Sequence, residues 1–246
     1  MRITARASPN YNHRTCPIDM LVLHYTGMQN GQIALDRMCD AAAGVSAHYM
    51  VSEDGRIVQM VGEDKRAWHA GVSSWQGDED LNSHSIGIEI VNGGHDFRLV
   101  DGSLEPFPEP QIHAVIELCS GILERWNIPS SRVVGHSDIA PARKQDPGEH
   151  FPWAKLAAAG IGVWPQDPQP ELRIDAPPEQ TMDFIRRTQV DLAEIGYTID
   201  VDGAPSEAMT GVITAFQRRW VQDAVTGKAD PLTRTMIDLV KAAMVK

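Results

Sequence analysis

Alternating apolar and polar positions mark five short segments of the first two thirds of the chain as β-strands. These segments lie near residues 20–25, 48–52, 56–61, 86–91 and 132–135. A two-residue period is typical of a strand that is buried on at least one face. The pair Asp54-Gly55 separates the second segment from the third, and this pair predicts a β-hairpin turn.

Helical periodicity is found between the predicted strands. From Pro110 to Trp126, apolar residues recur at helical spacing, and a proline suits the first turn of a helix. Residues 31–43 predict a second helix. Strands mixed with helices, together with at least one hairpin, predict an α/β (α+β) fold in which a mixed central β-sheet is flanked by helices.

A proline-dense, polar segment divides the chain. Residues 166–178 predict an extended, semi-stiff linker, because prolines cannot continue a helix or a central strand. Three helical patterns follow, at roughly 179–195, 208–221 and 231–244. We therefore expect a first domain over residues 1–165 and a small three-helix domain over residues 179–246.

Two of the predicted strands end in a histidine. An apolar run leads into His24, and a valine-rich run leads into His136, so both imidazoles would lie at one edge of the sheet. The proline and glycine residues after His136 indicate an ordered loop that could bring Asp146 back toward the histidines. Two histidines and one carboxylate leave the fourth tetrahedral position of zinc for water, which distinguishes a catalytic zinc site from a structural one.

A carboxylate lies inside another apolar strand. Alternation along residues 86–91 places Gly87, Glu89 and Val91 on one face, opposite three isoleucines. A carboxylate in so apolar a segment is costly unless it has a partner, and the water of a metal site would supply one. The alternative is a structural carboxylate that holds a loop.

Five segments together resemble a known family. They are LVLHYTG at 21–27, AHYMVSEDGRIVQMV at 47–61, AWHAG at 67–71, SIGIEIVN at 85–92 and GHSDIAPARKQDPG at 135–148. Their order and contexts resemble the zinc-dependent N-acetylmuramoyl-L-alanine amidases (amidase type 2, AmpD/AmiD-like), a family that includes the peptidoglycan recognition proteins.

The resemblance implies roles for specific residues. His24, His136 and Asp146 would bind one Zn²⁺, with Asp146 at a position where some relatives have a cysteine. Glu89 would act as general base and then general acid. Lys144 would stabilise the negative charge that develops on the carbonyl oxygen of the substrate.

Further residues are expected to contact the substrate. Some phage members carry a tyrosine before the histidine of the His-Tyr pair, whereas this chain has Ala47 before His48, so proton transfer is assigned to Glu89. For His48, the alternative is support of the site by hydrogen bonding. For His69, the alternative is a structural role. The full set of expected substrate-binding residues is Tyr25, Thr26, His48, His69 and Arg143. Five other histidines are assigned to the surface or to packing: His13, His84, His95, His113 and His150.

The implied reaction is hydrolysis of the amide between N-acetylmuramic acid, or its 1,6-anhydro form, and L-alanine. Peptidoglycan fragments or the sacculus would be the substrate. Two alternatives stay open: a peptidoglycan recognition protein without catalysis, and a prophage lysin with the same chemistry.

The last part of the chain resembles the three-helix peptidoglycan-binding domain. The resemblance rests on Leu192 to Tyr197, on Asp202-Gly203 and on Ala215-Phe216-Gln217. A purely structural appendage is the alternative.

Charge and cysteine content bear on partners and location. The net charge is −11, from 33 acidic and 22 basic side chains, and no basic block is present, which argues against a nucleic-acid partner. No apolar run is long enough to span a bilayer. Cys16, Cys39 and Cys119 show no metal-type spacing and are expected to be reduced packing thiols. This pattern favours a cytoplasmic protein, with a periplasmic or secreted one as the alternative if a signal segment has been removed.

Overall fold

In the computed structural model, residues 2–165 and 181–244 are described, so the linker predicted at 166–178 lies outside the described residues. A six-stranded mixed sheet forms the centre of the first part, in the order β1-β5-β4-β7-β3-β8. Strand β3 runs parallel to both β7 and β8, and β4 is parallel to β7 but antiparallel to β5. The strands of this sheet are β1 (Ile3–Ala5), β3 (Met20–Tyr25), β4 (Tyr49–Val51), β5 (Ile57–Gln59), β7 (Ser85–Ile90) and β8 (Val133–Gly135).

All five strands predicted from alternation are present, and the mixed sheet is confirmed. Three strands were missed: β1 and the antiparallel pair β2 (Tyr11–His13) and β6 (Lys65–Ala67). Each has only three residues, and β1 and β2 are exposed. A strand that buries no face leaves no apolar period in the sequence.

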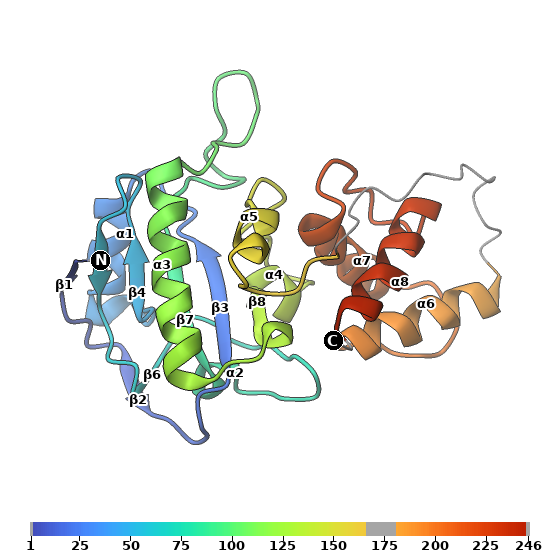
Figure 1. Cartoon of the computed structure of the whole chain (residues 1–246), viewed down its shortest axis with the longest axis horizontal. Helices are drawn as coiled ribbons and strands as arrows, with labels where there is room; N and C mark the ends of the chain where they lie inside the picture. The colour runs from blue at the N-terminus through green and yellow to red at the C-terminus, as the bar shows by residue number, and fades with distance from the viewer. Residues whose placement is uncertain (1, 166–180, 245–246) are drawn as a thin grey trace.

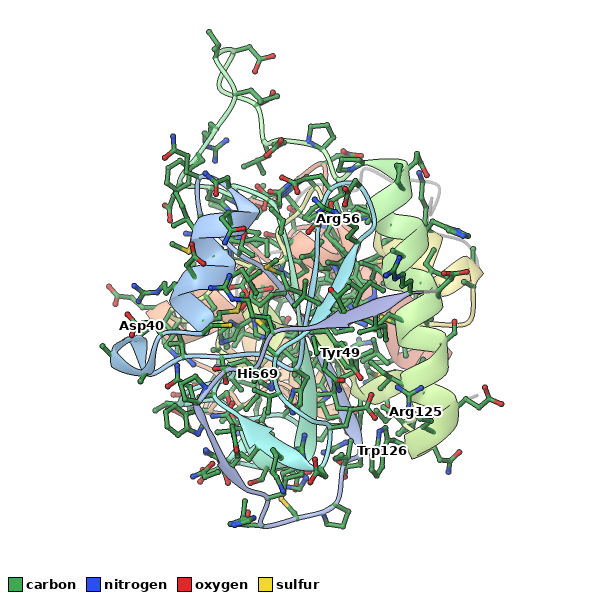
Figure 2. The ribbon with its side chains drawn as sticks, turned by 90° about the vertical axis from the view of Figure 1, so that its left-hand side faces the viewer. Asp40, Tyr49, Arg56, His69, Arg125 and Trp126 are labelled. Carbon is green, nitrogen blue, oxygen red and sulfur yellow. The ribbon has the colours of Figure 1, made fainter. Side chains whose placement is uncertain are left out.

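Helices cover both faces of the sheet, as Figure 2 shows with α1 on one side of the strands and α3 on the other. The helices and helical turns are α1 (Gly31–Met38), η1 (Ala41–Ala43), α2 (Leu81–His84), α3 (Glu109–Trp126), η2 (Ser130–Arg132), α4 (His136–Ile139), α5 (Trp153–Ala158), α6 (Met182–Ile195), α7 (Glu207–Trp220) and α8 (Pro231–Met244).

The predicted helix over 31–43 is interrupted. Helix α1 ends at Met38, and a separate helical turn begins after Asp40. The carboxylate of Asp40 accepts a hydrogen bond from the amide of Ala42, at 2.9 Å, and so caps the new turn. An aspartate that caps in this way competes with a continuous helix.

Helix α3 packs on the face of the sheet that carries the isoleucines. Leu21, Leu23, Ile86 and Ile88 are fully buried and share one core with the apolar side of this helix, including Cys119. Burial of each such side chain stabilises the folded state by roughly 1.5–3 kcal/mol. The opposite face of the same strands is thereby left for polar groups.

Helices α6, α7 and α8 lie on the side of the sheet that ends in β8, and α7 packs on α4 (Figure 1). Trp75 of the first part and Tyr197 of the second meet edge to face, with ring centroids 5.0 Å apart. One apolar core includes both of these residues together with Val22 and Phe216. The two parts of the chain therefore share a core across their boundary.

No helix within residues 2–165 and 181–244 combines the length and the apolarity that a membrane span requires.

Candidate active site

His24 and Glu89 lie side by side on neighbouring strands. Their backbones are paired in the register of β3 and β7, so their side chains leave the same face of the sheet. This is the face opposite α3. The strand alternation predicted for residues 86–91 therefore holds, and it directs both polar groups into one pocket.

The other two predicted ligands come from the β8–α4 region. His136 is the first residue of α4 and directly follows β8. The loop beyond α4 turns back, and the amide of Ser137 donates a hydrogen bond to the carbonyl oxygen of Asp146, at 2.8 Å. This contact brings Asp146 beside His136, as the proline and glycine pattern predicted.

Three atoms of these residues converge. His24 Nδ1 lies 2.9 Å from both His136 Nδ1 and Asp146 Oδ2, and His136 Nδ1 lies 3.0 Å from Asp146 Oδ2. All three residues are buried. Donor atoms that share one ion through bonds of roughly 2.0–2.2 Å must lie only a few ångströms apart, as these do.

Hydrogen bonds on the far side of each imidazole determine which nitrogen faces the cluster. His136 Nε2 lies 3.1 Å from the carbonyl oxygen of Ala70. That oxygen can only accept, so the ring proton is on Nε2 and the lone pair of Nδ1 faces the cluster. Such support of a ligand histidine by a backbone carbonyl is common in metal sites.

His24 is oriented by a longer relay. His24 Nε2 lies 3.0 Å from His69 Nδ1, and His69 Nε2 lies 3.2 Å from Ser85 Oγ. Ser85 Oγ in turn donates to the carbonyl oxygen of Leu81. With each N–H donating along this relay, His24 also presents the lone pair of Nδ1 to the cluster. Two lone pairs and a carboxylate oxygen then face one another, an arrangement that a cation stabilises.

The pKa values agree with this arrangement. Burial, reinforced by the nearby His136, lowers the pKa of His24 to about 4, which keeps the ring neutral. Burial by itself would raise the pKa of Asp146, but the adjacent His136 and His24 outweigh it and hold that pKa well below its usual range. Asp146 is thus an ionised carboxylate beside the neutral imidazole of His24, and these two groups with His136 are a donor set suited to zinc.

Glu89 is a different kind of carboxylate. Its Oε2 is buried and has no hydrogen-bond partner among the described residues. Burial, and then the negative charge of Asp146, raise the pKa of Glu89 well above its usual value, while Lys144 opposes the rise. A carboxylate with a raised pKa beside a pocket has the properties of a general acid or base.

The cluster lies in a pocket of about 510 Å³. Most of the predicted substrate-binding residues line it together with Glu89 and Lys144: Tyr25, Thr26, His69 and Arg143. His69 lies on the α1 side of the strands in Figure 2, the side that carries the cluster. Nine of the ten predicted site residues therefore line one pocket, and the exception is His48.

His48 lies behind the pocket wall. It is fully buried, its Nδ1 accepts a hydrogen bond from the amide of Gly87, and its Nε2 contacts the carbonyl oxygen of Lys65. It does not line the pocket, so the expected contact with substrate is corrected to support of the β4–β7 region. The physical reason is that His48 points inward from the start of β4.

Arg143 holds a neighbouring loop. Its guanidinium donates to the carbonyl oxygens of Ala70 and Val72, each at 2.6 Å. Ala70 is also the acceptor for His136. Arg143 therefore supports the loop that orients a candidate ligand, while one side of it lines the pocket.

Sequence reasoning missed His95, which it assigned to the surface or to packing. His95 Nδ1 lies 2.9 Å from the hydroxyl of Tyr25, and His95 Nε2 lies 3.1 Å from Glu149. These two partners lie 70 and 54 positions away from His95 along the chain. No local sequence pattern indicates such contacts.

A second possible metal group consists of Asp19, Asp78 and His84, and both of its carboxylates are paired with Arg132.

Comparison with known proteins agrees with this geometry. The N-acetylmuramoyl-L-alanine amidase family matches residues 14–149. N-acetylmuramoyl-L-alanine amidase AmiD of Escherichia coli (strain K12) is 37% identical over 229 residues, which are 90% of this chain and 81% of AmiD.

Two solved structures are similar over nearly the whole chain. One is E. coli AmiD in complex with the substrate anhydro-N-acetylmuramic acid-L-Ala-D-γ-Glu-L-Lys, with a TM-score of 0.75, 34% identity, and coverage of 93% of this chain and 91% of AmiD. The other is AmpDh3 of Pseudomonas aeruginosa in complex with anhydromuramic pentapeptide, with a TM-score of 0.74, 31% identity, and coverage of 96% and 95%. Since both the sequence and the fold match over most of their length, the chain belongs to the family of N-acetylmuramoyl-L-alanine amidases, and the pocket around His24, His136 and Asp146 is its candidate active site.

Proposed function

We propose that this protein is a zinc-dependent hydrolase that cleaves the amide between 1,6-anhydro-N-acetylmuramic acid and L-alanine in peptidoglycan fragments. The observation that carries the proposal is the convergence of His24 Nδ1, His136 Nδ1 and Asp146 Oδ2 within 3.0 Å of one another at the base of a pocket. Among the described residues three protein donors converge there, which leaves a coordination position for a reactant.

The donor set fits zinc. Two neutral imidazoles and one carboxylate are ordinary zinc ligands, and the two imidazoles are oriented by partners on their far sides. A zinc ion held by these residues would supply Lewis acidity to the hydrolysis.

Glu89 is the group that we assign to proton transfer. Its unpaired Oε2 accepts the proton of the attacking water, and the same oxygen returns a proton to the amine of L-alanine as that amine leaves. Burial and the negative charge of Asp146 raise the pKa of Glu89, which makes the group a better proton acceptor than an ordinary glutamate.

Lys144 is the group that we assign to charge stabilisation. It lines the same pocket and is close enough to oppose the rise in the pKa of Glu89. Its ammonium group would stabilise the negative charge that develops on the lactyl carbonyl oxygen during attack. Fixed positive charge in a partly buried site is often among the largest contributions to catalysis.

The substrate class is supported by the two solved relatives, whose bound molecules are an anhydro-N-acetylmuramic acid tripeptide and an anhydromuramic pentapeptide. We also propose that residues 1–165 form the catalytic domain, and that residues 179–246 bind peptidoglycan. Binding of the intact protein to purified sacculi tests the second of these proposals.

The test of the reaction offers the purified protein two substrates, an anhydromuramyl tripeptide and intact sacculi, with and without a chelator. Products are identified by mass spectrometry. We expect release of a peptide that begins with L-alanine, loss of this release with chelator, and its return when zinc is added. Faster release from the small fragment would support the anhydro preference. Tight binding of the fragment without any release would instead indicate a recognition protein.

A further inference from the structure

The region that presents His136 is held from outside the catalytic part of the chain. Asp138, on the same helix α4, is almost fully buried. Its Oδ2 accepts a hydrogen bond from the amide of Gly135, at 2.8 Å, and so caps the short helix on which His136 lies. The position of this carboxylate is therefore linked to that of the candidate ligand.

Both remaining partners of Asp138 come from the C-terminal part of the chain, one from α7 and one from the segment that follows α6. Arg219, on α7, forms a 2.8 Å ion pair with Asp138 Oδ2, and the hydroxyl of Tyr197 donates to Asp138 Oδ1 at 2.7 Å. Arg219 and Asp138 are 3% and 1% exposed in their side chains. A buried ion pair contributes when its charges also have further hydrogen bonds, as these have.

Arg219 holds the strand as well as the helix. Its second terminal nitrogen donates to the carbonyl oxygen of Val133, at 2.9 Å. The central carbon of the guanidinium lies over two indole rings, 4.3 Å from the centre of Trp153 and 4.4 Å from that of Trp220. Contact with two aromatic rings limits the freedom of the side chain to move. One side chain thus holds the first residue of β8 and, through Asp138, the start of α4, where His136 lies.

We infer that Arg219 and Tyr197 are positioning residues for the metal site, so that the C-terminal helices form part of the catalytic apparatus. This inference rests on the proposed metal site and deepens it. It assigns the C-terminal helices a role inside the site, distinct from any binding of peptidoglycan.

The test compares two arginine variants of the full-length protein. Arg219→Met removes the guanidinium that holds Asp138. Arg234→Met is the matched control, because Arg234 forms a 2.6 Å ion pair with the buried Asp191 between α6 and α8, within the C-terminal helices. Zinc affinity is measured by competition with a chromophoric chelator, and folding by circular dichroism.

We expect Arg219→Met to raise the zinc dissociation constant about 10–100-fold, the range typical when the hydrogen bonds that orient a metal ligand are lost. Arg234→Met should lower the melting temperature but leave zinc affinity unchanged. Equal zinc affinity in the two variants and the wild type would overturn the inference while leaving the proposed function intact. Absence of zinc binding by the wild type would instead overturn the proposed function.

Two milder variants keep the test decisive if Arg219→Met does not fold. Arg219→Lys retains a positive charge but cannot donate to Val133 and Asp138 in the same fork geometry. Tyr197→Phe removes only the hydroxyl and keeps the ring against Trp75. Both should weaken zinc binding less than Arg219→Met. Their Co²⁺ absorption spectra should differ from the wild-type spectrum, whereas wild-type affinity and an unchanged spectrum in both variants would refute the positioning role.

Discussion

A buried carboxylate oxygen without a partner destabilises the fold, and Glu89 Oε2 is such an atom. Its retention is understandable if the oxygen is reserved for the reaction. Glu89→Gln keeps the shape and removes the base. We expect zinc binding to persist and turnover to fall by about 10²–10⁴, the usual contribution of general acid-base catalysis.

His24→Ala and Asp146→Ala serve as the comparison for Glu89→Gln, because each should abolish zinc binding itself. Near-normal turnover in Glu89→Gln would assign the base to another group.

Glu89→Gln should also change stability. The pKa of Glu89 is raised in the folded state, mainly by burial. Its contribution to stability is therefore fully present only below the unfolded pKa and declines as pH rises through the folded pKa. In metal-free protein at pH 7, the neutral glutamine should raise the melting temperature above that of the wild type. A lower melting temperature would contradict the described environment of Glu89.

Lys144 is the second residue whose role can be separated by kinetics. If its ammonium stabilises the developing charge, Lys144→Ala should reduce kcat by about 10²–10³ with little change in zinc affinity. A loss confined to KM would make Lys144 a substrate-binding residue instead.

Gly87 is required by the relay that orients His24. A Cβ atom at this position would lie 2.5 Å from the ring of His69, which lies over the strand. Gly87→Ala should therefore displace His69 and weaken zinc binding, by up to about 10–100-fold. Gly121→Ala is the control, since its added methyl would contact only the end of Arg125. Equal zinc affinity in the two variants would show that His69 does not orient the ligand.

At the level of elements, α3 is attached to the sheet by a polar contact as well as by its apolar side. Gln111 is fully buried and donates to the carbonyl oxygens of Val51 and Val91, at 3.1 and 2.8 Å. Gln111→Met should lower the free energy of unfolding by about 1–3 kcal/mol, because the carbonyl oxygen of Val91 loses its donor and that of Val51 keeps only the amide of Val91. Zinc affinity and kcat should stay near wild type, since α3 lies on the face away from the cluster. A loss of zinc affinity would contradict this separation of the two faces.

Elements with a strong period were predictable from the sequence. Strands β3 and β7 are buried along almost their whole length and helix α3 is buried on one side, and each leaves an apolar pattern in the sequence. Strands β1 and β2 bury none of their residues and left no pattern. The break after Met38 depends on a single capping side chain, Asp40, and a capping contact does not alter the apolar period.

The candidate site was predictable in part for the same reason. His24, His136 and Asp146 follow strands or lie in punctuated loops, and their motifs identify them. The contacts that orient them come from distant residues, such as Ala70 for His136. His48 lies outside the pocket, and His95 contacts Tyr25 of the pocket wall, because burial and long-range partners decide where each histidine lies.

At the scale of the whole molecule, the packing of the C-terminal helices could not be read from the chain. The proline-rich segment predicted two domains joined by a linker, but nothing in the sequence indicated that the described parts share one core and several buried polar contacts. The apolar periods of α6 and α7 show that these helices bury a face. They do not show that part of the buried surface belongs to the sheet.

The ion pair between Arg218 of α7 and Glu149 of the first part of the chain should respond to pH. Burial would raise the pKa of Glu149, but its hydrogen bond with His95 and the charges of His95 and Arg218 lower it to about 2. A carboxylate with a lowered folded pKa stabilises the protein above its unfolded pKa, here 4.5, and this contribution is lost as pH falls toward 2. Wild-type stability should therefore decline over this interval more steeply than that of Glu149→Gln. Parallel denaturation curves for the two proteins between pH 5 and 3 would contradict the pairing.

The central claim is that three residues from distant parts of the chain hold one metal ion that retains an open position. An anomalous difference map, recorded at the zinc absorption edge from a crystal of zinc-loaded protein, tests this claim most directly. We predict one strong peak bonded to His24 Nδ1, His136 Nδ1 and Asp146 Oδ2, with no fourth protein ligand. A peak elsewhere, no peak, or an ion enclosed by four protein atoms would contradict the account.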